Sequence, residues 1–441
     1  NLHAIGKVDY ILITPEEFLE TCNRLAQFHI ERNGLIAVVV LLPQIYNEFS
    51  SGMQDITAIR DFVKMLYDRS GEGNEPRYLL LFGDGSYDNK NRLSGNTNLV
   101  PTYQSAESFS PVISYVTDDY YGILDDGEGT GENDMLDIGV GRLPVATIEE
   151  ATVAVDKIFH YATSSSKVMG DWRNVVTFVA DDEDSNIHLD DADNLAIYVD
   201  SNYTDYNVNK IYLDSYTQVS TPGGQRYPDV NAAINDQVEK GALIINYTGH
   251  GGEVGWAHER VLEVADINSW INYDRMPVFV TATCEFSRFD DPARTSAGEF
   301  VFLNRAGGGL ALFTTTRATF GSPNYSLNKS FYSYAFRKID GHFPTMGDII
   351  LYSKRQSGSD NNGRKFVLLG DPAQRLAYPE YDVVATAINS RPTSGQPDTI
   401  SALSTVSITG EIRDAQGRIM PGFNGTLNTT VFDKPQTVTT L

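Results

Sequence analysis

The feature that most constrains the fold is a series of short, wholly apolar segments that alternate with helical segments up to about residue 375. A strand that is apolar on both faces needs a sheet covered by helices on both sides. Residues 55–67 and 147–161 have the period of amphipathic helices, and Thr14 followed by Pro15 predicts a helix start. The pattern therefore predicts an α/β fold with mainly parallel sheets. The expected strands are residues 9–13, 35–40, 78–82, 137–140, 174–179, 242–245, 277–280 and 309–313.

The same pattern indicates how the chain divides into domains. Two series of strands and helices follow each other, so we expect α/β subdomains at residues 1–165 and 166–376. Beyond them apolar and polar residues alternate without a helical period, in residues 383–386, 405–409 and 426–432. We interpret residues 377–441 as the start of an all-β, Ig-like domain. Because no closing element follows, we expect a fragment of a longer protein, for which the absence of a signal peptide says little about location.

Charge and cysteine content exclude some classes of function. The net charge is −24 and the pI is about 4.6, which argues against non-specific binding of nucleic acid. No apolar run reaches the roughly 18 residues that a membrane helix needs. Of the two cysteines, Cys22 lies in an amphipathic helical pattern and is expected in the core, although a disulfide with Cys284 stays an alternative. Cys284 directly follows a strand and is a candidate nucleophile.

Cys284 and His250 are presented in the same way. Each comes after a buried strand and a few small residues, and ligands bind at the carboxyl edge of an open α/β sheet. A thiol and an imidazole at that edge suit nucleophilic catalysis, with the amides of Gly251 and Cys284 as the expected oxyanion hole. The alternatives are a turn histidine at a strand end and an inert buried cysteine.

The acid that orients His250 is expected to be Asp118 or Asp119, with Asp84 as a weaker candidate; a solvated turn is the alternative interpretation of residues 116–122. Hard oxygen ligands close in sequence suit structural Ca²⁺, although such runs are often only solvated surface. No cofactor is required for the chemistry, and the Cys/His spacing of a zinc site is missing. The acidic clusters are Asp125, Asp126 and Glu128 with Glu132 and Asp134, residues 181–184, and residues 190–193; the first three residues are the expected calcium ligands.

These motifs together resemble the gingipain-type cysteine peptidases, over roughly residues 9–375. Residues 246–256 (Asn-Tyr-Thr-Gly-His-Gly-Gly-Glu-Val-Gly-Trp) are similar to the catalytic-histidine motif of that family, and residues 283–290 to its catalytic-cysteine segment. Residues 117–121 resemble the segment of the third catalytic residue, which implies that role for Asp118. Residues 368–372 resemble the segment that closes the catalytic domain before an Ig-like domain. The resemblance implies a caspase/gingipain-like fold.

Within this family, residues 43–52, 55–60 and 79–88 resemble the sortase of the type IX secretion system of Bacteroidota such as Porphyromonas. That resemblance implies a cysteine peptidase at the outer-membrane surface of a Gram-negative bacterium. It would cleave the carboxy-terminal signal domain from secreted cargo and join the new terminus to anionic lipopolysaccharide, with a PorV-like outer-membrane barrel as partner. The alternatives are a secreted protease that only hydrolyses peptide bonds and a non-catalytic, cargo-binding scaffold.

One departure from the family concerns specificity. The lysine-cleaving gingipain has an acidic residue in the loop after the strand equivalent to residues 309–313, and Asn324 lies nearest that position here. We therefore expect no strict preference for lysine or arginine. Asn324, Trp256 and Glu285 are the expected residues of the substrate pocket.

Overall fold

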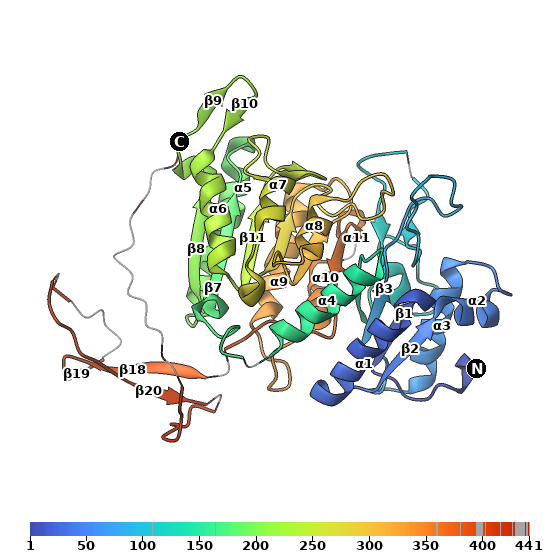
Figure 1. Cartoon of the computed structure of the whole chain (residues 1–441), viewed down its shortest axis with the longest axis horizontal. Helices are drawn as coiled ribbons and strands as arrows, with labels where there is room; N and C mark the ends of the chain where they lie inside the picture. Colours follow the sequence, from blue (N-terminus) through green and yellow to red (C-terminus); the bar gives the residue numbers. More distant parts are fainter. Residues whose placement is uncertain are drawn as a thin grey trace. The chain divides into compact units, whose positions relative to one another are not determined.

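The computed structural model (Figure 1) describes the chain except residues 108, 164, 359, 380, 394–399, 402, 415, 426, 428–436, 438–439 and 441. The chain divides into two compact units, Asn1–Ala377 and Tyr378–Thr437. In the part that the structure describes, no helix is long and apolar enough to cross a membrane. Both cysteines are free, and Cys22 is fully buried, as expected from its helical pattern.

The larger unit is built on one ten-stranded sheet. All neighbouring strands are parallel except β16 and β17, which are antiparallel. The strands from β2 to β17 therefore run opposite to those from β16 to β8. In spatial order they are β2 (Ala37–Leu41), β1 (Tyr10–Thr14), β3 (Tyr78–Phe82), β6 (Gly139–Leu143), β17 (Phe366–Leu369), β16 (Ala311–Thr315), β15 (Val278–Ala282), β11 (Ile244–Thr248), β7 (Val175–Ala180) and β8 (Asn207–Tyr212).

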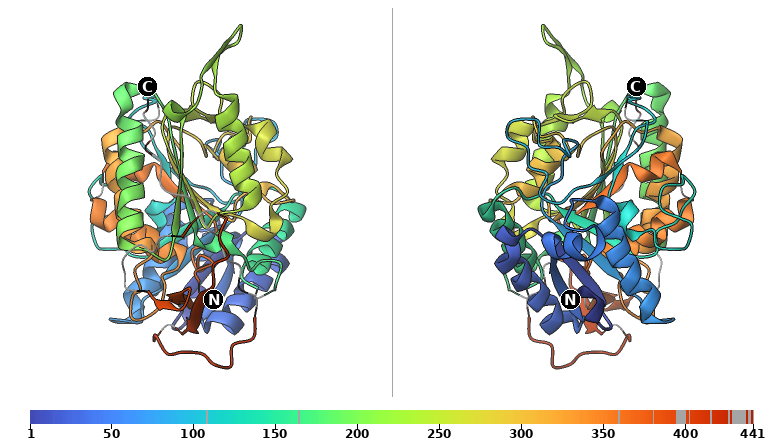
Figure 2. Two further views of the ribbon diagram at one scale, coloured as in Figure 1. Left: turned by 90° about the vertical axis from the view of Figure 1, so that its left-hand side faces the viewer. Right: turned by 90° about the vertical axis from the view of Figure 1, so that its right-hand side faces the viewer.

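Helices cover both faces of this sheet, as wholly apolar strands require. Figure 2 shows α5 and α9 on one face and α4 and α6 on the other. The α-helices are α1 (Leu19–Asn33), α2 (Leu42–Phe49), α3 (Ile56–Ser70), α4 (Ile148–Tyr161), α5 (Ile187–Asn202), α6 (Pro228–Lys240), α7 (Val264–Ser269), α8 (Ala297–Leu303), α9 (Gly321–Ala335), α10 (Met346–Ser357) and α11 (Asn361–Arg364).

Short strands form hairpins and a second small sheet. They are β4 (Tyr103–Gln104) with β5 (Val116–Thr117), β9 (Val219–Thr221) with β10 (Gly224–Arg226), and β12 (Gly251–Gly252), β13 (Gly255–Trp256) and β14 (Leu262–Glu263) in one group. The second unit contains β18 (Asp382–Ile388), β19 (Arg391–Pro392) and β20 (Ile408–Arg413), all antiparallel. The strand expected at residues 426–432 lies outside the described residues, and the Ig-like assignment remains a prediction.

The expected strands and helices of the first 375 residues are all present, with one displaced helix start. Thr14 does not cap a helix, because it is the last residue of β1 and its hydroxyl donates to the Phe82 carbonyl oxygen at 3.2 Å. A short 3₁₀ turn at Glu16–Phe18 follows, and α1 begins only at Leu19. By contrast, Thr147 caps α4 as its sequence suggests, accepting from the Glu150 amide at 3.2 Å.

The two expected subdomains share the single sheet rather than forming separate ones. Their boundary falls between the end of α4 and the start of β7. The chain then returns to the first half at its end, where β17 runs parallel to β6 and Leu369 is paired with Arg142. The two halves are therefore not two consecutive stretches of sequence, which the linear order of strands did not predict.

Candidate active site

His250 and Cys284 follow two neighbouring parallel strands at the same level. In the pairing of β11 with β15, Thr248 lies opposite Ala282. His250 and Cys284 each come two residues later, so both emerge from the carboxyl edge of strands that are about 4.8 Å apart. The pairing brings together the two residues that the sequence identified.

The segments after these strands touch directly. A Cβ atom on Gly251 would lie 2.5 Å from Thr283 Oγ1, closer than any side chain tolerates. Glycine next to His250 thus allows its loop to approach the strand of Cys284. The loop is also fixed by the Tyr247 hydroxyl, which donates to the His250 carbonyl oxygen at 2.6 Å.

Cys284 is half-buried and lies against the loop after β16. Its Sγ accepts a hydrogen bond from the Thr319 amide at 3.5 Å. The backbone turns sharply just after it, because Glu285 has a φ of 50°, a conformation that non-glycine residues adopt only where the surroundings enforce it. In the described part of the chain the Cys284 amide donates no hydrogen bond, as an oxyanion donor requires.

A buried lysine adds positive charge beside the thiol. Lys365 is fully buried, and its ammonium donates to the carbonyl oxygens of Val112 at 2.5 Å and Ala318 at 2.6 Å. Burial lowers the pKa of Lys365, and the negative charge of Cys284 opposes that shift.

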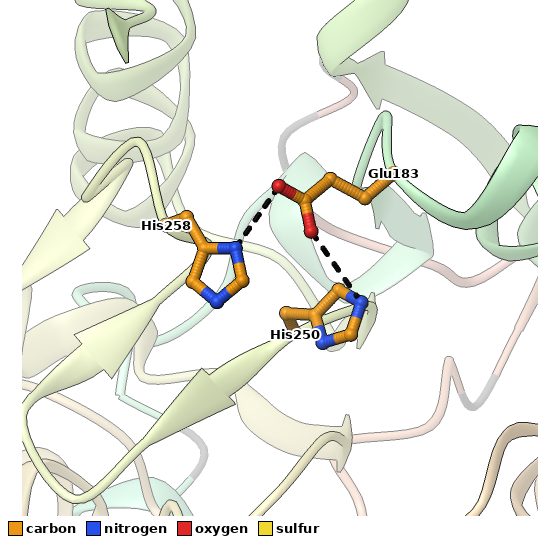
Figure 3. Close-up of side chains that lie close together, drawn as sticks. All are labelled: Glu183, His250 and His258. Carbon is orange, nitrogen blue, oxygen red and sulfur yellow. Dashed lines mark hydrogen bonds and ion pairs between the residues drawn. The ribbon is translucent and has the colours of Figure 1, made fainter. Parts of the chain in front are cut away.

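His250 is held by carboxylates that follow β7, the next strand of the sheet. Its Nε2 donates to Asp184 Oδ2 at 2.9 Å, and Glu183 Oε2 lies 3.6 Å away. Figure 3 shows Glu183 between His250 and His258, with one carboxylate oxygen toward each ring; the His258 Nδ1 distance is 2.9 Å. The hydrogen bond with His250 lowers the pKa of Asp184, as expected for a carboxylate that pairs with an imidazole.

The backbone conformation that delivers Asp184 is unusual. Asp184, Ser185 and Asn186 have φ angles of 58°, 58° and 68°. Three consecutive non-glycine residues in the left-handed region cost roughly 1–3 kcal/mol each and cluster at functional sites. The strain is consistent with a turn shaped to place the Asp184 carboxylate against His250.

Asp181 supports the histidine from its backbone side. This residue is almost fully buried, and its Oδ2 accepts a hydrogen bond from the His250 amide at 2.7 Å. Burial raises the pKa of Asp181 to about 7. The hydrogen bond from the His250 amide and the nearby imidazole lower this pKa, but by less than burial raises it.

The structure places the expected orienting acids elsewhere. Asp118 forms a buried ion pair with Arg142, at 2.7 Å and 2.8 Å, and also accepts from Thr102 at 2.9 Å. Asp119 pairs with Lys354 at 2.7 Å. Neither hydrogen-bonds to His250 among the described residues. Asp84 accepts from Thr97, and burial raises its pKa to about 7.

Of the residues expected in the substrate pocket, two have other surroundings. Trp256 has no exposed surface and stacks on Tyr247 with ring centroids 4.3 Å apart, so it supports the histidine loop from inside. Asn324 is buried and donates to Thr319 Oγ1 at 2.9 Å. Because the Thr319 amide donates to Cys284 Sγ, Thr319 links Asn324 to Cys284.

Glu285 is the one of the three that faces open space. It lines a hollow of about 410 Å³ together with Arg288 and Arg317. Both arginines are paired already, Arg288 with Glu253 at 2.6 Å and Arg317 with Asp290 at 2.6 Å. The remaining walls of the hollow come from Tyr87, Gln104, Ser105, Phe109, Pro111, Ser114, Tyr115 and Val116.

The expected calcium ligands are only partly brought together. The carboxylate oxygens of Asp125 and Glu128 lie within 4.8 Å of each other and of Asp137. Asp126 is exposed and pairs with Lys64 at 2.9 Å instead. Calcium binding at this cluster stays a prediction.

With this geometry established, comparison with known proteins assigns the chain to a family. Residues 3–377 match Peptidase family C25. The chain therefore belongs to this family, the gingipain-type cysteine peptidases.

Two curated relatives are gingipains. Gingipain R2 of Porphyromonas gingivalis (strain ATCC BAA-308 / W83) is 22% identical over 281 residues, which cover 62% of this chain and 32% of the relative. A gingipain R1 of Porphyromonas gingivalis is 22% identical over 234 residues, covering 52% of this chain and 19% of the relative. The chain thus spans a third or less of the length of these relatives.

Solved structures include similar folds. The Arg-specific cysteine proteinase gingipain R (RgpB) has a TM-score of 0.65 at 17% identity, covering 95% of this chain and 90% of that chain. The gingipain-like α/β fold expected from the motifs is confirmed. The crystal structure of dimeric latent PorU from Porphyromonas gingivalis is 26% identical, with a TM-score of 0.49 over 95% of this chain and 35% of that chain.

Several residues of the site were missed by sequence reasoning. The sequence marks residues 181–184 only as one of several acidic clusters, but this run follows a strand that is paired with the strand of His250. The pairing of these two strands could have pointed to Asp184, but it follows from the order of strands in the sheet, which the sequence alone does not give. For Lys365 and Thr319 the sequence carried no signal, because each is far from Cys284 along the chain.

Proposed function

We propose that this protein is a cysteine endopeptidase in which Cys284 is the nucleophile and His250 the proton carrier. The observation that carries the proposal is the pairing of β11 with β15, which presents both side chains at one sheet edge in the same register. A thiol beside a base at a substrate-binding edge is the arrangement of a nucleophilic cysteine enzyme.

In the proposed acylation step, His250 accepts the thiol proton of Cys284 as Sγ attacks the scissile carbonyl carbon. An S–C bond forms, the peptide C–N bond breaks, and the leaving amine takes that proton from His250. The amides of Cys284 and Gly251 donate to the oxyanion, and losing one such donor typically adds about 2.7–4 kcal/mol to the barrier. Because Nε2 of His250 is used by Asp184, Nδ1 is the ring nitrogen that faces substrate in this mechanism.

We further propose that the acyl group is transferred to an amine rather than only to water. Support comes from residues 43–52, 55–60 and 79–88, which resemble PorU, the sortase of the type IX secretion system. In that step the amine nitrogen bonds to the acyl carbon and gives one proton to His250, the C–S bond breaks, and the Cys284 sulfur takes that proton to regenerate the thiol. The proposed substrates are secreted cargo proteins with carboxy-terminal signal domains, and the proposed acceptor is anionic lipopolysaccharide.

The proposed setting is the outer-membrane surface, with a PorV-like barrel as partner. We propose that cargo is selected by docking of its signal domain rather than by one side chain beside the scissile bond. The absence of an acidic side chain at position 324 fits this mode of selection. Asn324 is neutral and is held by Thr319 and Asn362, at 2.9 Å in both cases. A substrate lysine or arginine would therefore gain no ion pair from this position.

Mass spectrometry of cargo after incubation with the enzyme and a small amine tests both steps. We expect an amide adduct at the new carboxyl terminus, and we expect Cys284→Ala to abolish it with the fold intact. Hydrolysed product alone would favour a secreted gingipain-like protease. Equal cleavage by the wild type and Cys284→Ala would refute the nucleophile assignment, and no cleavage by either would favour a cargo-binding scaffold.

A further inference from the structure

Behind the histidine loop lies a group of buried carboxylates that the proposed chemistry does not use. Asp181 and Asp182 follow β7, Glu259 lies in the loop after β13, and Asp214 lies in a 3₁₀ turn after β8. Asp181 is 1% exposed, Glu259 4% and Asp214 8%, so none of these three is a solvated surface acid. The group is separate from the exposed acidic run near residue 125.

The carboxylates of this group are incompletely satisfied. Asp182 Oδ1, Glu259 Oε2 and Asp214 Oδ2 are buried and have no hydrogen-bond partner. In the described residues no lysine or arginine forms an ion pair with any of the four acids. Buried charges are normally paired or bound to a metal ion.

The other oxygens of the group are held by neutral donors that fix their direction. The Tyr227 hydroxyl donates to Asp182 Oδ2 at 2.7 Å. The Gln218 amide nitrogen donates to Glu259 Oε1 at 3.4 Å. Each of these two acids is thus anchored through one oxygen while the second oxygen is left without a partner. This is how second-shell donors orient metal ligands.

The spacing fits one large, oxygen-binding cation. One carboxylate oxygen from each of Asp181, Asp182 and Glu259 lies within 4.8 Å of the others. Oxygens on opposite sides of a Ca²⁺ ion are up to about 5 Å apart, since Ca–O distances are 2.3–2.6 Å. Mg²⁺ requires shorter distances of about 2.0–2.1 Å, and Zn²⁺ prefers nitrogen and sulfur ligands that this group does not offer.

We propose that Asp181, Asp182 and Glu259 bind one Ca²⁺ ion that holds the loop of His250. The link to the catalytic residue is Asp181, whose Oδ2 accepts from the His250 amide at 2.7 Å. Glu259 lies further along, in the loop between β13 and β14, so it would tie that second loop to the ion. The ion would thereby hold the two segments on either side of the β12–β13 hairpin against the end of β7.

Metal binding tests the site without relying on peptidase activity. In the Cys284→Ala chain, which cannot digest itself by the proposed mechanism, we would measure Ca²⁺ stoichiometry by calorimetry after chelation. We expect the affinity of one site to be at least tenfold weaker in Glu259→Gln and unchanged in Glu149→Gln, whose exposed carboxylate pairs with Arg305 outside the acidic clusters. Unchanged binding in Glu259→Gln, or no binding at millimolar Ca²⁺, would overturn the proposal.

Terbium luminescence gives a second readout that does not need an acidic residue to be replaced. Tb³⁺ bound beside Asp182 would be excited through Tyr227, which hydrogen-bonds to that carboxylate. We expect Ca²⁺ to displace the signal, and Tyr227→Phe to dim it severalfold with at most a small change in Ca²⁺ affinity. If Ca²⁺ does not displace the emission, then Tb³⁺ is bound at another place or the carboxylates are protonated. Either result would refute the proposed site. A failure of peptide cleavage would leave both measurements unaffected.

Discussion

At His250 the two ring nitrogens have different surroundings, and this sets the chemistry of the site. Nε2 donates to Asp184 at 2.9 Å, whereas Nδ1 forms no hydrogen bond within the described residues. In a catalytic triad the acid fixes the tautomer, so that the opposite nitrogen carries the proton exchanged with the substrate. In the proposed mechanism Asp184 takes the role of the acid, because it is hydrogen-bonded to Nε2, whereas the sequence resemblance implies Asp118.

Substitution of the two aspartates distinguishes these assignments. We expect Asp184→Asn to lower kcat by about 10- to 100-fold. This loss is smaller than the loss of all general acid–base catalysis, because the Glu183 carboxylate remains near the His250 ring. The free energy of unfolding should hardly change, because Asp184 is largely exposed. Steady-state kinetics and urea denaturation of the same samples measure both quantities.

Asp118→Asn should show the opposite pattern. It leaves the guanidinium of Arg142 buried without its partner, which typically costs about 3–5 kcal/mol of stability. A stable Asp118→Asn enzyme with a much reduced kcat, beside an active Asp184→Asn enzyme, would instead support the role that the resemblance implies.

The sequence identified His250 and Cys284 because both follow wholly apolar strands, and the position of a residue after a strand is a local property. Asp184 and Lys365 could not be assigned in this way. Their roles depend on which strands are neighbours and on how a loop turns, and neither is encoded in a local pattern. Trp256 was expected in the pocket because it lies near His250 in sequence, but a large apolar ring is more stable in the core.

At the scale of secondary structure, the contact between the loops after β11 and β15 depends on Gly251. An alanine there would place its Cβ atom 2.5 Å from Thr283 Oγ1 and push the two loops apart. We expect Gly251→Ala to lower kcat about 100-fold, since a displacement of roughly 1 Å has this effect on a positioned site. Adding Thr283→Ala, which removes the obstructing atom, should restore most of the activity; a double variant no better than Gly251→Ala would contradict this steric account.

The packing of α4 against the end of α8 predicts a pH dependence of stability. Lys157 of α4 is buried, and its ammonium donates to the carbonyl oxygens of Phe302 at 2.6 Å and Asn304 at 3.3 Å. Burial lowers the pKa of Lys157 to about 7. Between pH 7 and the unfolded value near 10.4, the unfolded chain holds a proton that the folded chain has lost.

Unfolding therefore takes up a proton in this window, and the contribution of Lys157 to the free energy of unfolding rises with pH. The expected gain from pH 7 to pH 9 is of the order of 2 kcal/mol. Urea denaturation at several pH values would measure it, with Lys157→Met as the control that lacks this gain. If the wild type and Lys157→Met have parallel profiles, Lys157 is not responsible.

Most elements were predictable because the strands are apolar throughout and because caps such as Thr147 mark helix starts. The strand bounds of the structure lie two or three residues further along in several cases, for example at β11 and β16. The less apolar residues that end these strands are still paired with the neighbouring strand, which hydropathy cannot detect. The antiparallel β16–β17 pair gave no local signal, because strand direction depends on the long connection between its partners.

At the scale of the larger unit, buried polar contacts join residues 1–165 to the end of the second series of the sequence, where β17 lies in the first half of the sheet. Asp371, just after β17, accepts from Tyr10 of β1 at 2.8 Å and pairs with His29 of α1 at 2.6 Å. Lys354 of α10 reaches Asp119 in the same way. Because these contacts link residues far apart in sequence, residues 1–165 and 166–376 should unfold together, even though the sequence divides them into two series.

Calorimetry of Asp371→Asn tests this cooperativity. The substitution weakens the buried hydrogen bonds of Asp371 with Tyr10 and His29, and a buried polar group left unsatisfied typically costs about 1–3 kcal/mol. If the halves form one cooperative unit, the transition of the whole sheet should move several degrees lower as a single peak. If they fold independently, the variant should split the transition, because residues near β1 would melt early while β7, β11 and β15 keep their original Tm. The second outcome would also mean that the site at β11 and β15 does not need the first half of the sheet for its stability.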